Sequence, residues 1–122
     1  MSNSSSAVTR IEKPWGYEIH WARTERYIGK ILHVRAGHAL SLQYHNQKDE
    51  TMYVHAGRVL LETEHDGRLV GREMNIGDSV RLTPKTIHRI SAISDCDILE
   101  ASTPELDDVV RLEDRYGRAP QS

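Results

Sequence analysis

The chain has 122 residues, of which 38% are hydrophobic and 28% charged, and its formal net charge is −2. This length suits one domain with a single core and is too short for two. Acidic and basic residues are interspersed, and no apolar run approaches the roughly 20 residues of a transmembrane helix. We therefore expect no nucleic-acid surface and no membrane span. The single cysteine, Cys96, excludes a disulfide framework and favours a reducing cytoplasm.

The chain begins with a polar stretch, residues 1–7, that lacks the basic and apolar regions of a signal peptide. We expect residues 1–10 to form a disordered polar tail, residues 11–118 a single domain, and residues 119–122 a short C-terminal tail. Pro14 and Trp15 precede the first clear strand pattern, where they fit either a dimer-forming arm or a cap over one end of the domain. A homodimer is the expected assembly.

Short β-type runs separated by turn signals follow one another along the rest of the chain. We expect strands at 17–22, 27–34, 39–45, 51–55, 58–64, 68–73, 79–82, 88–92 and 97–102. Asp66-Gly67 is a two-residue hairpin signal between two of these strands. Residues 107–114 fit either a short helical turn or an edge strand, and no longer segment has apolar residues at helical period. The sequence therefore predicts an all-β fold, a jelly-roll barrel of two antiparallel sheets around a cavity.

Four side chains form a candidate metal site: Gln43, His45, Glu50 and His88. Gln43 and His45 are two residues apart, so on a strand they point to the same side. Residues 46–49 can turn the chain back and bring Glu50 onto the adjacent antiparallel strand, facing the same space. Two nitrogens and two oxygens suit a borderline divalent cation such as zinc, manganese, iron, cobalt or nickel. The competing interpretation is a barrel that keeps these residues and has lost its metal.

The spacing of glycines around these ligands resembles the first motif of the cupin superfamily. That motif has a glycine, five residues, a ligand, one residue, a histidine, three or four residues, a glutamate, six residues and a glycine. Every interval is met between Gly37 and Gly57, with Gln43 at the place of the usual first histidine. The resemblance implies that residues 11–118 form a cupin double-stranded β-helix.

The second cupin motif is only partly met. The interval from Gly77 to His88 has the right length, but the usual proline, glycine and asparagine are replaced by Thr83, Lys85 and Ala92. These differences leave the fold prediction intact and concern the shape of the loop before His88.

Three further stretches resemble the cupin domain of type II mannose-6-phosphate isomerases. They are residues 13–18 (KPWGYE), 40–45 (LSLQYH) and 110–118 (VRLEDRYGR), and the similarity runs in register from about Lys13 to Arg118. The family's triple-histidine run is here His45-Asn46-Gln47. The nucleotidyltransferase domain usually fused upstream has no room in a chain of this length. The resemblance implies a zinc-type site that binds an aldose phosphate and interconverts it with the ketose.

Such an isomerisation needs an electrophile on the carbonyl oxygen, a general acid/base, and a grip on the phosphate. The resemblance places the family's lysine on Lys30 and its catalytic closing arginine on Arg118. Lys30, Glu100 and a metal-bound water are the candidate bases. The candidate phosphate partners are Arg118, Arg111, Arg89 and Lys85. The ligand is therefore expected to be a small molecule, a sugar phosphate. Two alternatives stay open: another cupin enzyme (an oxygenase, dehydratase or lyase), or a non-catalytic module that binds a sugar or metabolite.

Overall fold

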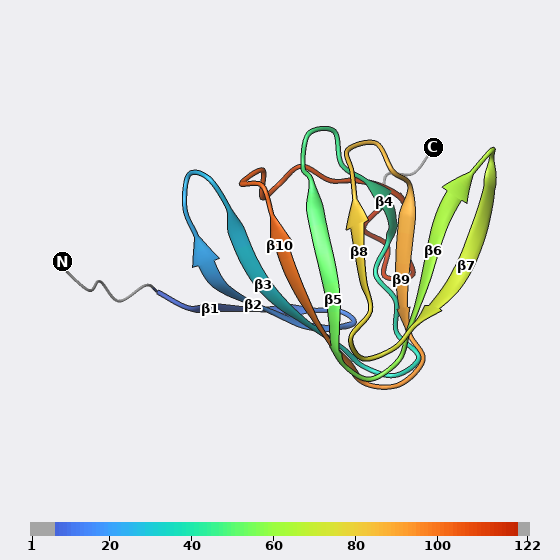
Figure 1. Ribbon diagram of the computed structural model, residues 1–122, viewed down its shortest axis with the longest axis horizontal. Coiled ribbons are helices and arrows are strands. Elements are labelled where there is room, and N and C mark those ends of the chain that lie inside the picture. Colours follow the sequence, from blue (N-terminus) through green and yellow to red (C-terminus); the bar gives the residue numbers. More distant parts are fainter. Residues whose placement is uncertain (1–6, 120–122) are drawn as a thin grey trace.

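The computed structural model describes residues 7–119, which form eleven β-strands in two antiparallel sheets that curl around a common interior (Figure 1). The larger sheet has, in spatial order, β1 (Thr9–Lys13), β2 (Gly16–Arg23), β3 (Ile28–Val34), β10 (Cys96–Ser102), β5 (Glu50–Ala56) and β8 (Ser79–Leu82). The smaller sheet has β11 (Val110–Glu113), β4 (Leu42–Tyr44), β9 (His88–Ala92), β6 (Val59–His65) and β7 (Arg68–Met74). This architecture confirms the predicted all-β jelly roll.

The chain passes repeatedly between the two sheets, and these crossings close the barrel. β4, β6, β7 and β9 lie in the smaller sheet, whereas β5, β8 and β10 lie in the larger one. As a result, β10 pairs with β3 on one side and with β5 on the other, which joins segments that are distant in the sequence. No helix in the described part of the chain is long and apolar enough to cross a membrane.

Most of the core lies toward the end of the barrel opposite the β4–β5 and β8–β9 loops, although Leu82, the last residue of β8, is paired with Glu50 at the loop end. In β5 the burial alternates strictly, because successive side chains of a strand point to opposite faces. The core cluster consists of buried apolar side chains from most strands: Trp15, Leu32, Val34, Met52, Val54, Val59, Leu61, Met74, Leu82, Ile90, Ala92, Cys96 and Ile98. Trp15 therefore packs into the core of its own chain, which agrees with the cap interpretation of this segment.

Several local expectations are confirmed and others need correction. Asp66 and Gly67 both have positive φ, 52° and 79°, and join β6 to β7 as a tight hairpin. Residues 107–114 contain the edge strand β11 and no helical turn. The expected strand at 39–45 is reduced to β4, with one isolated bridge at Ala39. β1 was not expected, and it begins at Thr9, inside the segment 1–10 that was assigned to a polar tail; residues 1–6 and 120–122 lie outside the described part.

Candidate metal centre and its cavity

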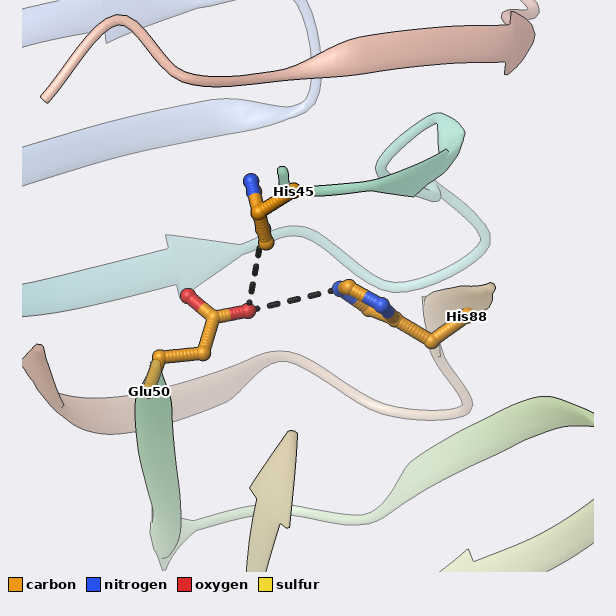
Figure 2. A group of neighbouring side chains, drawn as sticks. All are labelled: His45, Glu50 and His88. Carbon is orange, nitrogen blue, oxygen red and sulfur yellow. Dashed lines mark hydrogen bonds and ion pairs between the residues drawn. The ribbon is translucent and has the colours of Figure 1, made fainter. Parts of the chain in front are cut away.

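Three of the four predicted ligands converge at one end of the barrel (Figure 2). His45 directly follows β4, Glu50 begins β5 and His88 begins β9, so the ends of three strands position them. All three side chains are buried, and their ligand atoms lie within 4.8 Å of one another. Oε1 of Glu50 is 3.2 Å from Nε2 of His45 and 3.4 Å from Nε2 of His88.

The hydrogen bonds of the two imidazole rings determine which nitrogen of each can bind a cation. Nδ1 of His45 donates to the carbonyl of Asp108 at 2.5 Å, and Nδ1 of His88 donates to the carbonyl of Thr86 at 2.9 Å. Because a carbonyl only accepts, a neutral ring carries its proton on Nδ1 and offers the Nε2 lone pair. Nε2 of His88 is buried and has no hydrogen-bond partner among the described residues. Two lone pairs and a carboxylate oxygen facing one point fit a divalent metal ion.

The electrostatics of this group favour an anionic Glu50. Burial by itself would raise the pKa of this carboxyl, but the hydrogen bond with His45, the contact with the His88 ring and the charge of Lys48 hold the pKa well below its usual range. Burial likewise opposes the charged form of His45, yet the hydrogen bond and negative charge of Glu50 raise the pKa of that imidazole. An anionic carboxylate that draws positive charge to its neighbours is the form that binds a cation.

Gln43, the fourth predicted ligand, lies in the same row of side chains. It is directly opposite His88 in the pairing of β4 with β9, and it lines the cavity at this end of the barrel. Oε1 of Gln43 accepts a hydrogen bond from Oγ of Ser41 at 3.0 Å. A carbonyl-type oxygen has a second lone pair, so this bond leaves Gln43 able to coordinate.

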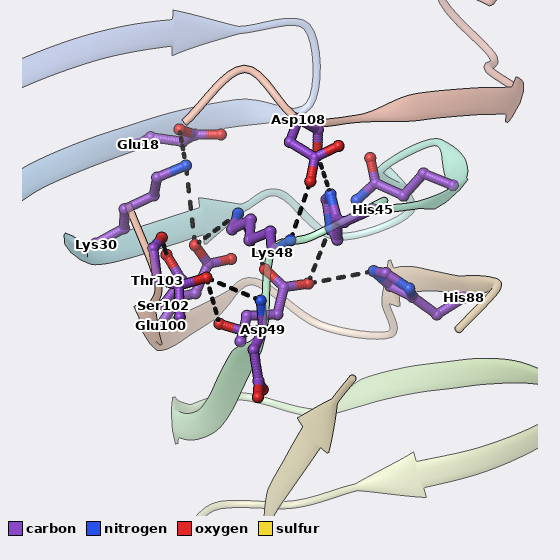
Figure 3. Close-up of polar contacts among 12 residues, drawn as sticks. Glu18, Lys30, His45, Lys48, Asp49, His88, Glu100, Ser102, Thr103 and Asp108 are labelled. Carbon is purple, nitrogen blue, oxygen red and sulfur yellow. Dashed lines mark hydrogen bonds and ion pairs between the residues drawn. The ribbon is translucent and has the colours of Figure 1, made fainter. Parts of the chain in front are cut away.

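A buried network of opposite charges adjoins the three ligands (Figure 3). Nζ of Lys48 lies 3.1 Å from Oε2 of Glu50 and 3.3 Å from Oε2 of Glu100. Nζ of Lys30 lies 3.8 Å from the same oxygen of Glu100 and 3.5 Å from Oε1 of Glu18. The predicted residues Lys30 and Glu100 are therefore brought to the ligand set, with Lys48 as the link.

Sequence reasoning did not find Lys48 or Glu18. Lys48 was treated only as part of a turn, and nothing in its spacing distinguishes it from a solvated turn residue. Glu18 gave no signal either: Tyr17, Ile19 and Trp21 alternate with Glu18 and His20, so the pattern places Glu18 on the polar face, whereas the structure buries it. Its burial is explained by its contacts with Lys30 and with His20, whose Nε2 is 2.8 Å from Oε1 of Glu18.

Glu100 has the acid/base properties that catalysis near neutral pH requires. Its side chain is buried, and burial together with the negative charge of Glu50 raises the pKa of this carboxyl to about 7, against the opposing charges of Lys48 and Lys30. A group whose pKa lies near the working pH is present in both protonation states and can both take and return a proton. A strongly shifted titratable group inside a cavity is also a common mark of a functional site.

Asp108 holds the loop that carries His45 and Lys48. Its carboxylate accepts hydrogen bonds from the backbone N–H groups of Asn46, Gln47 and Lys48 at 3.0, 2.6 and 2.9 Å. These bonds, the one from Gln47 first, lower the pKa of the Asp108 carboxyl to about 2. Its backbone carbonyl also accepts the bond from His45, so one residue fixes both the loop and the ring.

The four candidate phosphate partners separate into two pairs. Arg118 and Arg111 line the cavity, and the guanidinium of Arg118 is held by the carboxylate of Asp114 at 2.9 and 3.0 Å. Arg89 lies outside the cavity lining, where it bonds to Glu62 and Glu113.

Lys85 is exposed and donates to Oδ1 of Asn46 at 2.5 Å. Its φ of 71° shows that the loop before His88 keeps the conformation for which the cupin motif uses glycine. Lys85 thus ties the β8–β9 loop to the β4–β5 loop.

Two antiparallel sheets closed around a cavity, with two histidines and a glutamate converging at one end, define a cupin. The comparisons with known proteins narrow this class. Residues 2–114 match the family described as Mannose-6-phosphate isomerase C-terminal, and the chain belongs to this family.

Two relatives carry mannose phosphate in their names. The chain is 30% identical over 113 residues to the mannose-1-phosphate guanylyltransferase ManC of Salmonella typhimurium, covering 88% of this chain and 23% of that protein. It is 29% identical over 113 residues to the mannose-1-phosphate guanylyltransferase of Escherichia coli, with the same coverage of 88% and 23%. The chain thus spans less than a quarter of the length of these two relatives.

Solved structures share the fold at low sequence identity. Oxalate decarboxylase from Bacillus subtilis superposes with a TM-score of 0.76 at 18% identity, covering 97% of this chain and 33% of that one. The capsular polysaccharide assembling protein CapF from Staphylococcus aureus gives 0.73 at 16% identity, covering 90% and 35%. KdgF from Halomonas sp. gives 0.68 at 19% identity, covering 84% and 89%. These similarities establish the barrel.

Proposed function

We propose that this chain is a metal-dependent sugar-phosphate isomerase that interconverts an aldose phosphate of the mannose 6-phosphate type with its ketose. The observation that carries the proposal is the position of Glu100. This buried carboxyl, with a pKa of about 7, is linked through Lys48 to the ligand Glu50 inside one cavity. Membership of the mannose-6-phosphate isomerase C-terminal family, and the mannose phosphate named in both relatives, support this substrate class.

The metal would be held by His45, Glu50 and His88, with Gln43 as the fourth ligand. Imidazole and carboxylate ligands suit zinc, and they equally suit manganese, which forms the Mn(II) centres of Bacillus subtilis oxalate decarboxylase. When bound, such an ion supplies an electrophile for the substrate's carbonyl oxygen.

Glu100 is proposed as the group that moves the proton. Isomerisation removes the proton from C2 of the aldose and returns one to C1, while a hydroxyl proton passes from O2 to O1, so no co-reactant is consumed. As the anion, Glu100 takes the C2 proton; as the acid, it gives the proton back to C1. The ammonium groups of Lys30 and Lys48 both lie near Oε2 of Glu100 and hold its carboxylate in place.

Arg118 is proposed to contact the substrate from the cavity wall. Asp114 accepts bonds from the backbone N–H, Nε and Nη2 of Arg118, so the guanidinium is held in a fixed orientation. A fixed guanidinium loses little side-chain entropy when it binds an oxygen of the ligand.

The cytoplasmic location and the homodimer stay predictions of the sequence, and light scattering on the purified protein tests the dimer.

The test combines turnover with proton exchange at C2. Metal-loaded protein is incubated with mannose 6-phosphate in D₂O, and NMR follows both the ketose phosphate and the loss of the C2 proton signal. We expect wild type to show both, and Glu100→Gln to lose about 10²- to 10⁴-fold in exchange with its metal content unchanged. Asp97→Asn is the matched control, because Asp97 is on the same strand but bonds to His33 outside the cavity.

Three outcomes would redirect the assignment. A fully metal-loaded wild type that converts no hexose or pentose phosphate would contradict the proposed isomerase activity. Consumption of oxygen by the iron-loaded protein would favour the oxygenase alternative. Stabilisation by a sugar phosphate without any product would indicate a binding module.

A further inference from the structure

Arg111 lies in one row with two of the proposed metal ligands. It is directly opposite Gln43 in the pairing of β11 with β4, and Gln43 is directly opposite His88 in the pairing of β4 with β9. Residues directly opposite each other in antiparallel strands project from the same face of the sheet. The side chain of Arg111 is therefore on the inner face, and it lines the same cavity as Gln43.

Arg111 differs from the other cationic side chains of this cavity in its charge balance. Each of the others has a carboxylate within 4 Å: Lys13 and Lys30 have Glu18, Lys48 has Glu50 and Glu100, and Arg118 has Asp114. Within residues 7–119, Arg111 has no such carboxylate, and its Nε is buried without a hydrogen-bond partner. A buried charged donor without an acceptor is unfavourable, so an oxygen of a bound ligand at Nε would stabilise this side chain.

We propose that Arg111 is the anion-binding residue of the cavity and that the ligand presents a phosphoryl group to it. A guanidinium donates two parallel N–H groups to two oxygens of such a group, which a lysine cannot do. The need for an oxyanion rests on the charge balance alone, whereas the choice of phosphoryl rests on the proposed function.

The position of Arg111 sets how the ligand would lie. Neighbouring strands are about 4.8 Å apart, so the Cα of Arg111 is separated from that of His88 by about 10 Å, with Gln43 between them. A ligand whose anionic group contacts Arg111 would extend along this row toward the metal centre.

Binding experiments test the inference without turnover. Inorganic phosphate, mannose 6-phosphate and mannose are titrated into metal-loaded and chelator-treated protein, with ³¹P NMR and thermal stabilisation as readouts. The chelator-treated sample separates phosphate bound by the protein from phosphate bound to a metal. The variants are Arg111→Gln, Arg111→Lys and the control Arg72→Gln, which removes an exposed arginine from β7 at the opposite edge of the same sheet.

We expect wild type and Arg72→Gln to bind mannose 6-phosphate equally, and Arg111→Gln to bind it at least about tenfold more weakly. Arg111→Lys should fall between them, because it keeps the charge and loses the paired donors. This variant decides the question if Arg111→Gln does not fold.

Unchanged binding in both Arg111 variants would overturn the inference, and so would a wild type that binds neither phosphate compound in either form. If the proposed isomerase activity is wrong but the anion site is right, the result would be different. A protein that converts no sugar phosphate but binds mannose 6-phosphate through Arg111 would remove the proposed activity and support the anion site.

Discussion

The two ends of the barrel interior are built by the same strands with opposite chemistry. On β3 the inward positions pass from Lys30 to Leu32 and Val34, and on β10 they pass from Glu100 to Ile98 and Cys96. Glu100 lies toward the β4–β5 loop, because Ser102, two residues later in β10, is opposite Glu50 at the start of β5. The β4–β5 and β8–β9 loops are at the top of Figure 1, and most of the apolar core lies toward the other end.

This difference shows that a buried position in the barrel can hold either an apolar or a charged side chain, at different cost to stability. Burying apolar side chains stabilises the fold in proportion to the area removed from water. Burying carboxylates is unfavourable unless cations and hydrogen bonds compensate them, which is why Glu50 and Glu100 are accompanied by Lys48 and Lys30. One end of the barrel therefore holds the molecule together, and the other supports a site that would not be kept for stability alone.

The largest effect is expected at the polar end, on metal content. Protein purified without a histidine tag should contain about one equivalent of divalent metal, and His88→Ala should contain none, since Nε2 of His88 has no other function in the buried site. His55→Ala removes an exposed histidine from β5 and should keep the metal. Elemental analysis makes the comparison. Full metal content in His88→Ala would remove this residue from the ligand set.

At the apolar end the expected effect is on stability. Ile98 is 1% exposed, so Ile98→Ala leaves a cavity in the core and should lower the free energy of unfolding by about 2–5 kcal/mol. Urea unfolding measures this change, and elemental analysis of the folded variant should show unchanged metal content. A variant that is folded but metal-free would mean that the two ends are not independent.

A smaller effect is expected where the charge network meets the ligands. Oε1 of Glu50 faces both histidines while Oε2 contacts Lys48, so Lys48 orients the carboxylate toward the metal position. Lys48→Met keeps the aliphatic stem and should weaken metal affinity about 10- to 100-fold, measured by competition with a chelator.

Lys48→Arg should restore most of that affinity, because it returns a positive charge near Oε2. Arg68→Met, at an exposed position of β7 outside the cavity, is the control and should bind metal as wild type does. Equal affinities in Lys48→Met and wild type would show that Glu50 is oriented by its backbone alone.

The sequence by itself determined the barrel and predicted the group of His45, Glu50 and His88 that the structure brings together. Alternating apolar residues and turn signals such as Asp66-Gly67 act over a few residues, so they are readable before the chain is folded. The same holds for His45 and Glu50, which are joined by one short turn between adjacent strands. β1 escaped detection because four of its five residues are polar and the strand has no continuous apolar face.

Tertiary structure decided the surroundings of the site. Glu100 meets Lys30 only through the register of β10 on β3, and Arg111 joins the row of Gln43 and His88 only through the pairing of β11 with β4. Asp108 bonds to His45, although the two residues are 63 positions apart in the sequence. Sequence spacing carries no information on such pairings, because long-range register is set by how the whole barrel closes and by which buried charges must be compensated.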